Sequence, residues 1–504
     1  MLTIKQTEAE FCGKVPLHQT NLIQPHGYLL VIDTQNFTIL QASDNVEELL
    51  EKPAKEVIGS PLQNYVSESD LLDVKHRFTY SGNEGIPFIF SFHSGERLAV
   101  IKFHESYFIL EVDLEVRSFQ KTTSFITVYQ ELKYIMAAIE KTTSVNEACL
   151  IAIQELKRVS GFDKIMVYSF DEEWNGDVIA EVMEEGMDSY LGLKFPASDI
   201  PQQARALYQK MPYRLIPNIN YTPVKLYPVI NPKVNGFTDL SESNLRSVAG
   251  VHLEYLANMK VKASMSTRIM ENGKLWGLMA CHHRTAHYLS FELCSLFELV
   301  GNVLSSRIHS LGAQDVFQYK TGMQEKQVEL LEDVYKESDI FKALDKNESS
   351  VLNLLSADGV VIILNGQMIA YGKVPGTEEV KELVYWLRSR NVNKTYHEQG
   401  LSFEFEPASS YSDKASGLLV LPIQAEKGNY ILAFRPEKRR KVNWGGNPNE
   451  AINFEPGGKQ YHPRASFKIW QENVDKKALP WQEPELEVAE TFRNFVMDYA
   501  LNKM

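Results

Sequence analysis

Cysteine is scarce in this sequence, and the few cysteines stand far apart. The 504 residues include four of them, Cys12, Cys149, Cys281 and Cys294, and no CxxC pair. This pattern excludes a disulfide framework and favours a reducing, cytoplasmic location. A metal site at Cys281, His283 and His287 would match no standard zinc spacing, so we expect no metal and interpret Cys281 as a buried free thiol.

Long apolar runs are also missing. No stretch approaches the roughly 18 apolar residues of a membrane span, and the start, "MLTIKQTEAEF", lacks the apolar core of a signal peptide. Apolar residues make up 44% and charged residues 23%, which is typical of a globular protein without a membrane part. The net charge of −13 argues against non-specific nucleic-acid binding.

Enzyme motifs are absent as well. The sequence contains no GxSxG, no Walker loop, no GxGxxG and neither a histidine-kinase phosphoacceptor motif nor an ATP-binding box. We therefore expect a chain without catalysis of its own, and any output domain would lie outside it.

The length favours about three domains. Residues 27–115 predict an antiparallel sheet with helices, and 126–161 predict two helices before the next strands. Residues 217–244 carry four prolines and predict a long loop, and Asn272–Gly273 predicts a hairpin turn. A third α+β domain begins near residue 357 and contains a Gly- and Pro-rich insertion at 439–470, and the C-terminal stretch is an amphipathic helix.

A long helix is expected from Phe291 onward. Its apolar positions step by three or four, and they include Leu293, Phe297, Val300, Leu304, Ile308 and Leu311. Two interpretations stay open for this stripe: packing on the helix's own domain, or a dimer seam.

The stretch "FPASDIPQQARALY" (195–208) contains an acid between two prolines. Asp199 could cap the helix that follows. The stiff surroundings of Asp199 also suit a general base, a metal ligand or a counter-charge.

Further polar residues flank the long loop. Arg214, Arg246 and His252, together with Ser264 and Ser266, suit a carboxylate or phosphate ligand because guanidinium groups bind such anions in a bidentate manner. His282 stands at the end of an apolar strand, where it faces the opposite way from Cys281 and His283. The alternative to anion binding is that Arg214 and Arg246 are surface residues exposed to solvent.

Five stretches identify a resemblance to a family. "NLIQPHG", "FPASDIPQQARALY", "ACHH", "NWGGNP" and "PRASF" occur in this order and resemble the signature stretches of bacteriophytochromes. The resemblance implies an α+β chain of three domains with antiparallel sheets flanked by helices. These are an N-terminal segment and PAS domain (1–120), a GAF domain (121–310), and a PHY domain (311–504) with a tongue at about 439–470.

The resemblance also implies the cofactor, biliverdin IXα, and the residues that bind it. Asp199 would lie against the pyrrole nitrogens as the partner of a buried cation, with Ile200 and Pro201 beside it. His252 would contact the rings, and His282 would hydrogen-bond the ring D carbonyl. The propionates and the ring D pocket would be contacted by Arg214, Arg246, Tyr208, Ser264, Ser266, Tyr168, Phe195 and Tyr255.

The implied attachment is a thioether to Cys12. Plant and cyanobacterial phytochromes use a GAF cysteine directly before the loop histidine, and Val251 occupies that place here. The resemblance further implies that the N-terminal segment threads through the long loop in a figure-eight knot. Ala249 stands where the family often has Ser, so one hydroxyl near a propionate is missing.

The implied function is a red/far-red photoreceptor that converts between Pr and Pfr. Asp199 would pair with Arg464 of the tongue in Pr, and Ser466 would be the partner in Pfr. The long helices would form a homodimer and pass the signal to an output domain or response regulator. The alternative is a light-independent GAF regulator that binds a nucleotide or haem.

Overall fold

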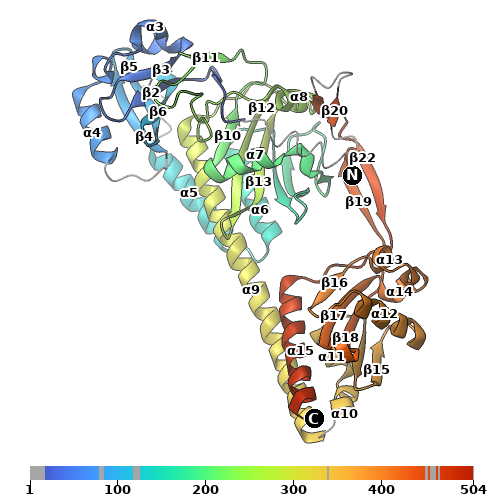
Figure 1. Cartoon of the computed structure of the whole chain (residues 1–504). Coiled ribbons are helices and arrows are strands. Elements are labelled where there is room, and N and C mark those ends of the chain that lie inside the picture. Colours follow the sequence, from blue (N-terminus) through green and yellow to red (C-terminus); the bar gives the residue numbers. More distant parts are fainter. Residues whose placement is uncertain are drawn as a thin grey trace. The chain divides into compact units, whose positions relative to one another are not determined.

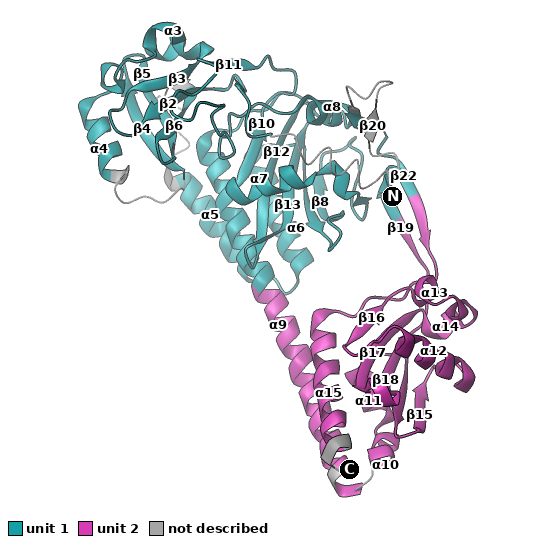
Figure 2. Cartoon of the chain, viewed as in Figure 1, with its two compact units in different colours: residues 1–309, 443–470 teal, residues 310–442, 471–504 magenta. Residues whose placement is uncertain are grey.

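The structure is a computed structural model that describes residues 17–78, 85–116, 125–337, 340–448, 452–454, 461–463 and 466–502. The chain divides into two compact units (Figures 1 and 2). The first unit contains residues 1–309 and 443–470, and the second contains 310–442 and 471–504. Most of the predicted tongue therefore belongs to the first unit, although the sequence of the second unit surrounds it.

The N-terminal part of the first unit is a seven-stranded antiparallel sheet with the strand order β1-β11-β3-β2-β6-β5-β4. Its elements before residue 117 are β1 Leu22–Ile23, β2 Gly27–Asp33, β3 Ile39–Ser43, α2 Glu47–Leu50, α3 Ala54–Val57, α4 Glu68–Phe78, β4 Ile86–Phe92, β5 Gly95–Phe103 and β6 Tyr107–Val116. Alternation accounts for β4, where Phe88, Phe90 and Phe92 are buried and the residues between them are exposed. The predicted antiparallel sheet with helices is confirmed.

One strand of this sheet comes from the region that the sequence predicts as a loop. Within residues 217–244, β11 (Val224–Tyr227) pairs with β1 and β3. The prediction was wrong for these four residues, because Leu226 is buried with Ile23 in a small apolar cluster of this sheet. A strand completed by distant partners gives little local signal.

The N-terminal segment contacts the long loop on two sides, at β11 and at the end of the loop near residues 244–245. The N–H of Leu226 donates to the carbonyl of Asn21 (3.0 Å), and the N–H of Gln24 donates to the carbonyl of Leu245 (2.6 Å). The side chain of Gln24 donates to the carbonyls of Leu215 and Asn244. The segment at residues 21–24 thus lies between β11 and the end of the loop, as the predicted knot requires.

A second sheet follows, with the strand order β10-β12-β13-β7-β8-β9-β19-β22. The elements of this part of the chain are α5 Phe125–Glu140, α6 Val145–Ser160, β7 Lys164–Phe170, β8 Gly176–Met183, β9 Lys194–Phe195, α7 Gln202–Lys210, β10 Tyr213–Ile216, α8 Gly250–Asn258, β12 Ala263–Glu271 and β13 Lys274–His283. The hairpin turn predicted at Asn272–Gly273 is confirmed, and both of its residues have positive φ, 50° and 75°.

Helix α9 (Phe291–Glu337) begins in the first unit and continues into the second (Figure 2). Its residues Phe297, Val300, Leu304 and Ile308 are buried in one core with α5, α6 and one face of the second sheet. The N-terminal part of the apolar stripe therefore packs on its own domain, which decides between the two interpretations for these residues.

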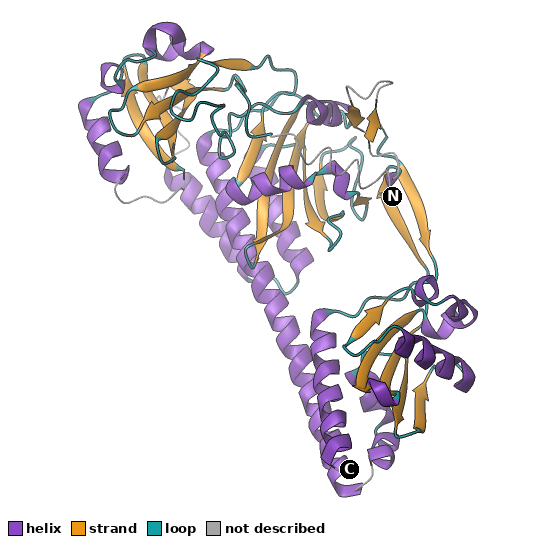
Figure 3. Ribbon diagram, viewed as in Figure 1, coloured by secondary structure: helices purple, strands orange, loops and turns teal. Residues whose placement is uncertain are grey.

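The second unit has a five-stranded sheet with the order β15-β14-β18-β17-β16 (Figure 3). Its elements are α10 Ile340–Lys346, α11 Glu348–Leu354, β14 Gly359–Leu364, β15 Gln367–Gly372, α12 Thr377–Ser389, β16 Tyr396–Glu398, α13 Leu401–Glu404, α14 Ser412–Ala415, β17 Gly417–Gln424, β18 Asn429–Arg435 and α15 Glu483–Asn502. The insertion contributes β19 Arg440–Gly445, β20 Ile452–Phe454, β21 Tyr461–Pro463 and β22 Ile469–Val474. No described helix is both long and apolar enough to span a membrane.

Gly277 on β13 provides a test of packing inside the second sheet. A Cβ at this position would lie 2.4 Å from the backbone carbonyl oxygen of Tyr168, whereas a Cβ at Gly322 of α9 would meet nothing within 4 Å. Gly277→Ala should lower the free energy of unfolding by about 1–3 kcal/mol, measured by denaturant titration. Gly322→Ala is the control and should raise it by up to about 1 kcal/mol, because alanine favours helix. Equal effects of both substitutions on the free energy of unfolding would contradict the close approach of Gly277 to the backbone of Tyr168.

Candidate functional site

A cavity of about 280 Å³ lies in the first unit, on the face of the second sheet that is turned away from α5, α6 and α9. Strand alternation divides the residues between the two faces. Tyr168 on β7 and His282 on β13 face the cavity, whereas Cys281 is buried in the core behind the sheet. Helices α7 and α8 and the turn at 197–200 complete the wall.

The structure brings together every described residue of the predicted chromophore site. The cavity is lined by Tyr168, Phe195, Asp199, Ile200, Pro201, Tyr208, Arg214, Arg246, His252, Tyr255, Ser264, Ser266 and His282. Cys12 and Arg464 lie outside the described residues. Ser466 is described, is exposed and does not line the cavity.

Asp199 does not cap helix α7. It lies in a short 3-10 turn, Ala197–Asp199, and α7 begins after Pro201 without a side-chain cap. Its Oδ2 instead accepts a hydrogen bond from the hydroxyl of Tyr255 on α8 at 2.9 Å. The helix-cap interpretation is therefore wrong, and the carboxylate is placed at the cavity wall.

Two arginines stand at another part of the wall. Arg214 donates to the backbone carbonyls of Ser243 and Asn244, and Arg246 donates to those of Leu240 and Ser241. Burial lowers the pKa of Arg214 to about 9, with repulsion from Arg246 as a second cause, and burial lowers the pKa of Arg246 to about 10. Among the described residues no carboxylate forms an ion pair with either of them. The pair therefore favours an anionic group inside the cavity.

Hydroxyl groups accompany the arginines. Tyr208 and Ser266 are hydrogen-bonded at 2.5 Å between their oxygens. Strand pairing places Ser266 opposite Arg214 and Ser264 opposite Ile216. Arginines and hydroxyls on neighbouring elements give the cavity a polar part suited to carboxylate groups.

The two cavity histidines are neutral at physiological pH. Burial holds the pKa of His282 at about 3, with the charges of Lys164 and His252 as smaller causes. Burial likewise lowers the pKa of His252 to about 4, although its ring is accessible from the cavity. A neutral imidazole has one donor and one acceptor nitrogen, so each ring can donate a hydrogen bond to a ligand or accept one from it.

Tyr190 was missed by the sequence reasoning. It lines the cavity, and the ammonium group of the fully buried Lys164 lies 3.5 Å from the centre of its ring. Lys164 is also paired with Glu181 at 2.7 Å. No local motif marks Tyr190. Met166, also missed, has the period-2 spacing to Tyr168 that would have indicated it.

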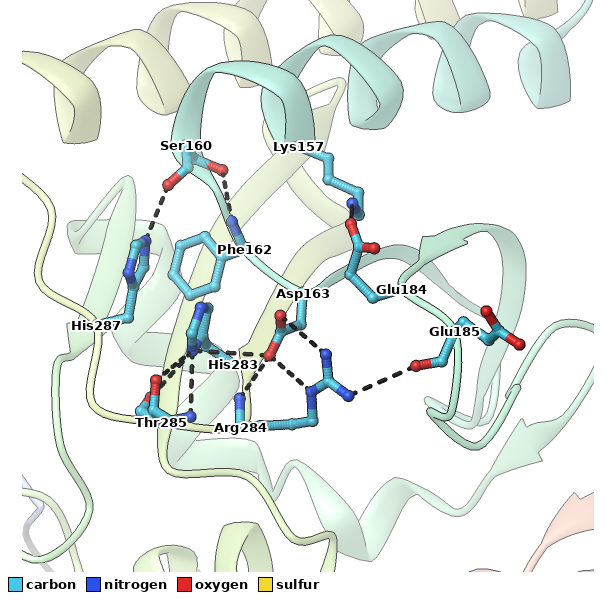
Figure 4. A network of polar contacts seen from close by, with 10 residues as sticks. All are labelled: Lys157, Ser160, Phe162, Asp163, Glu184, Glu185, His283, Arg284, Thr285 and His287. Carbon is cyan, nitrogen blue, oxygen red and sulfur yellow. Dashed lines mark hydrogen bonds and ion pairs between the residues drawn. The ribbon is translucent and has the colours of Figure 1, made fainter.

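His283 and His287, which the sequence raised as metal ligands, take part in structural contacts elsewhere (Figure 4). Nδ1 of His283 faces Asp163 at 3.7 Å and the backbone of Thr285, and Nε2 of His287 lies 2.9 Å from the carbonyl of Ser160. Within the described ranges, no group of three or more His, Cys, Asp or Glu side chains is arranged to hold a metal ion.

Described parts of the insertion also reach this region of the first unit. Pro463 lines the cavity, Phe467 meets the ring of Tyr255 edge to face at 5.2 Å, and His462 lies 2.9 Å from the carboxylate of Glu254. Trp444 of β19 pairs with Lys194 of β9. The insertion therefore contacts α8 and the edge of the sheet close to Asp199.

Three family models match the chain. They are described as PAS fold (residues 12–117), GAF domain (144–308) and phytochrome region (323–504). The chain is 37% identical over 502 residues to cyanobacterial phytochrome B of Nostoc sp., covering 99% of this chain and 67% of that protein. It is 31% identical over 505 residues to a bacteriophytochrome of Pseudomonas aeruginosa, covering 100% and 68%. The chain thus spans about two thirds of the length of these curated relatives.

Solved structures are similar over nearly the whole chain. A crystal structure of a bacteriophytochrome from the photosynthetic bacterium R. palustris superposes with a TM-score of 0.86 at 35% identity, covering 98% of this chain and 99% of the other. The photosensory core module of a Stigmatella aurantiaca phytochrome gives 0.84 at 33% identity, covering 97% and 98%.

His282 provides a test of the buried site. Below the ordinary histidine pKa of about 6.5, the unfolded chain binds a proton at His282 that the folded chain does not, so stability falls as the pH falls toward 3. At pH 5 this residue should cost the apoprotein roughly 2 kcal/mol relative to pH 7. In His282→Gln the difference between the unfolding free energies at pH 7 and pH 5 should shrink by about that amount. The control, His309→Gln on exposed α9, should leave the difference as in the parent, and an unchanged difference in His282→Gln would refute the burial.

Proposed function

The chain belongs to the phytochrome family of red/far-red photoreceptors, whose chromophore is a linear tetrapyrrole, and from this premise we propose that it binds biliverdin covalently through Cys12. A bound tetrapyrrole would supply the absorption of light and a double bond about which one ring can rotate. The cavity of the first unit would hold it. The observation that carries the proposal is a carboxylate, two arginines without ion-pair partners among the described residues, and two neutral histidines around one cavity.

Each polar group has a role in this proposal. Asp199 is the partner of the protonated pyrrole nitrogens, because a cation in a cavity removed from water needs an opposite charge. Arg214 and Arg246 bind one propionate with Tyr208 beside them, and Ser264 and Ser266 bind the other. His252 contacts the rings, and neutral His282 donates to the ring D carbonyl.

The aromatic residues would leave room for rotation of ring D. Tyr168, Phe195 and Tyr255 line the cavity with the newly found Tyr190. Gly176 lies against this cluster, since a Cβ there would come within 1.8 Å of the Tyr168 ring. Aromatic side chains supply a large apolar contact area for a flat ring.

The proposed signal passes through the insertion at 439–470, the tongue. Asp199 would pair with Arg464 in Pr, and Ser466 would take part in Pfr after the tongue refolds. The contacts of Pro463 and Phe467 near the cavity support this coupling. The long helices would form a homodimer and reach an output domain or response regulator, so that the chain itself catalyses nothing. Its cytoplasmic location stays a prediction.

Biliverdin and light test the function directly. Apoprotein mixed with biliverdin should show a red absorption band that red light converts to a far-red band and that far-red light restores. A protein that takes up no biliverdin but binds a nucleotide or haem would be the light-independent regulator instead. A bound pigment without photoconversion would refute the photoreceptor proposal.

Cys12→Ser tests the attachment. The polar groups proposed to bind the pigment all lie on other residues of the cavity wall, so the variant should still bind biliverdin under native conditions. The pigment should be lost on denaturation, with no zinc-induced fluorescence in a denaturing gel. Cys149→Ser serves as the matched control and should keep its pigment, since that thiol is buried in the core behind the sheet. Pigment that stays attached in Cys12→Ser would place the bond on another residue.

A further inference from the structure

The turn that carries Asp199 is held by an arginine from the helix that follows it. Arg205 lies on α7 and reaches back across the turn. Its Nη1 donates to the carbonyl of Ile200 at 2.5 Å and to that of Ala197 at 3.3 Å. These two carbonyls stand on either side of Asp199 in the sequence, so one guanidinium joins both ends of the turn.

The backbone of the turn has few bonds of its own. The N–H groups of Ala204 and Arg205 both donate to the carbonyl of Pro201, and the N–H of Asp199 donates to the carbonyl of Pro196. The carbonyl of Ile200 therefore receives its hydrogen bond from the Arg205 side chain rather than from helix α7. The proline rings fix φ only at residues 196 and 201, so they do not set the torsions of Ser198 and Asp199. Proline stiffness alone cannot aim the carboxylate.

The guanidinium is itself held in place. It lies 4.6 Å from the ring of Trp174, which belongs to the turn between β7 and β8 and has a φ of 65°. Trp174 packs on Phe170, and Phe170 packs on Tyr168 of the cavity wall, with ring centres 5.5 and 5.2 Å apart. No carboxylate in the described part of the chain forms an ion pair with Arg205, and burial lowers its pKa. The guanidinium group thus stacks on Trp174 and donates to the carbonyls of Ala197 and Ile200.

The same β7–β8 turn holds the other side of the Asp199 turn. Oδ1 of Asn175 accepts from the N–H of Ala197 at 3.2 Å. Asn175 is fixed in turn by Asp171, which accepts from its backbone and side-chain nitrogens at 2.8 and 3.1 Å and pairs with Lys194 at 2.8 Å. Ala197 is therefore bound at both its N–H and its carbonyl by side chains from outside the turn.

We propose that Arg205 is a positioning residue for Asp199: stacked on Trp174, it ties the carbonyls of Ala197 and Ile200 together and so keeps the carboxylate at the cavity wall beside Tyr255. The role of the carboxylate toward a chromophore rests on the proposed function, but the positioning does not. Arg205 touches no ligand in this account and acts only through the turn.

Arg205→Met tests the proposal, because methionine keeps an unbranched apolar stem and lacks the guanidinium group that donates both hydrogen bonds. In the apoprotein, hydrogen exchange of the Asp199 amide, which donates to the carbonyl of Pro196, should accelerate by about tenfold or more. Arg205→Lys should recover part of this protection, because an ammonium group can reach a carbonyl but cannot reproduce the planar stack on Trp174.

Arg268→Met is the matched control. Nη1 of Arg268 donates to the carbonyls of Tyr208 and Gln209 at the other end of α7, so the loss in hydrogen bonds is the same. This variant should leave exchange of the Asp199 amide as in the parent. Parent-like exchange in Arg205→Met, or equal acceleration in both variants, would overturn the proposal.

A second readout uses the pigment. Biliverdin-loaded Arg205→Met should keep its covalent pigment and form at least severalfold less Pfr after red light, with Arg205→Lys between it and the parent. Full Pfr formation in Arg205→Met would overturn the link from Arg205 to the carboxylate. If the parent itself bound no biliverdin, the proposed function would fail while the exchange experiment still decided the positioning.

Discussion

The candidate site depends on one electrostatic constraint: a carboxylate must stand at the wall of a mostly apolar cavity. Such a charge is stable only with hydrogen bonds and an opposite charge nearby. The hydroxyl of Tyr255 provides one hydrogen bond to Asp199. A cationic ligand in the cavity would supply an opposite charge, and the insertion contacts α8 through Phe467 and His462.

The rest of the first unit can be understood as support for this arrangement. The sheet has one face in the core with α5, α6 and α9 and the other toward the cavity, so a single set of strands both stabilises the domain and positions Tyr168, Ser266 and His282. The long loop contributes β11 to the N-terminal sheet, and Gln24 binds the loop from inside. Because Arg246 lies at the end of this loop, the contacts of the N-terminal segment also steady an arginine of the site.

Much of the fold was predictable because its signals are local. The Asn272–Gly273 turn, the alternation of β4 and the two helices after residue 125 follow from short-range preferences. Strand β11 was not predictable, since only partners about 180 residues away complete it. At the site, the motif resemblance indicated the cavity residues, but Tyr190 and the buried Lys164 carry no motif. The contact of Arg205 with the turn at 197–200 depends on a side-chain direction that spacing alone does not give.

The central claim is that the carboxylate of Asp199 stabilises a buried cation, and a pH titration of the pigment measures this most directly. The parent and Asp199→Asn would be loaded with biliverdin, and the absorption band of the protonated pigment would be followed as the pH rises. Removal of the negative charge should lower the apparent pKa of the bound pigment by about 1–3 pH units, because an opposite charge nearby favours the charged form. Asp177→Asn, on the partly exposed β8 carboxylate, should leave that pKa unchanged. An unchanged or raised pigment pKa in Asp199→Asn would contradict the account.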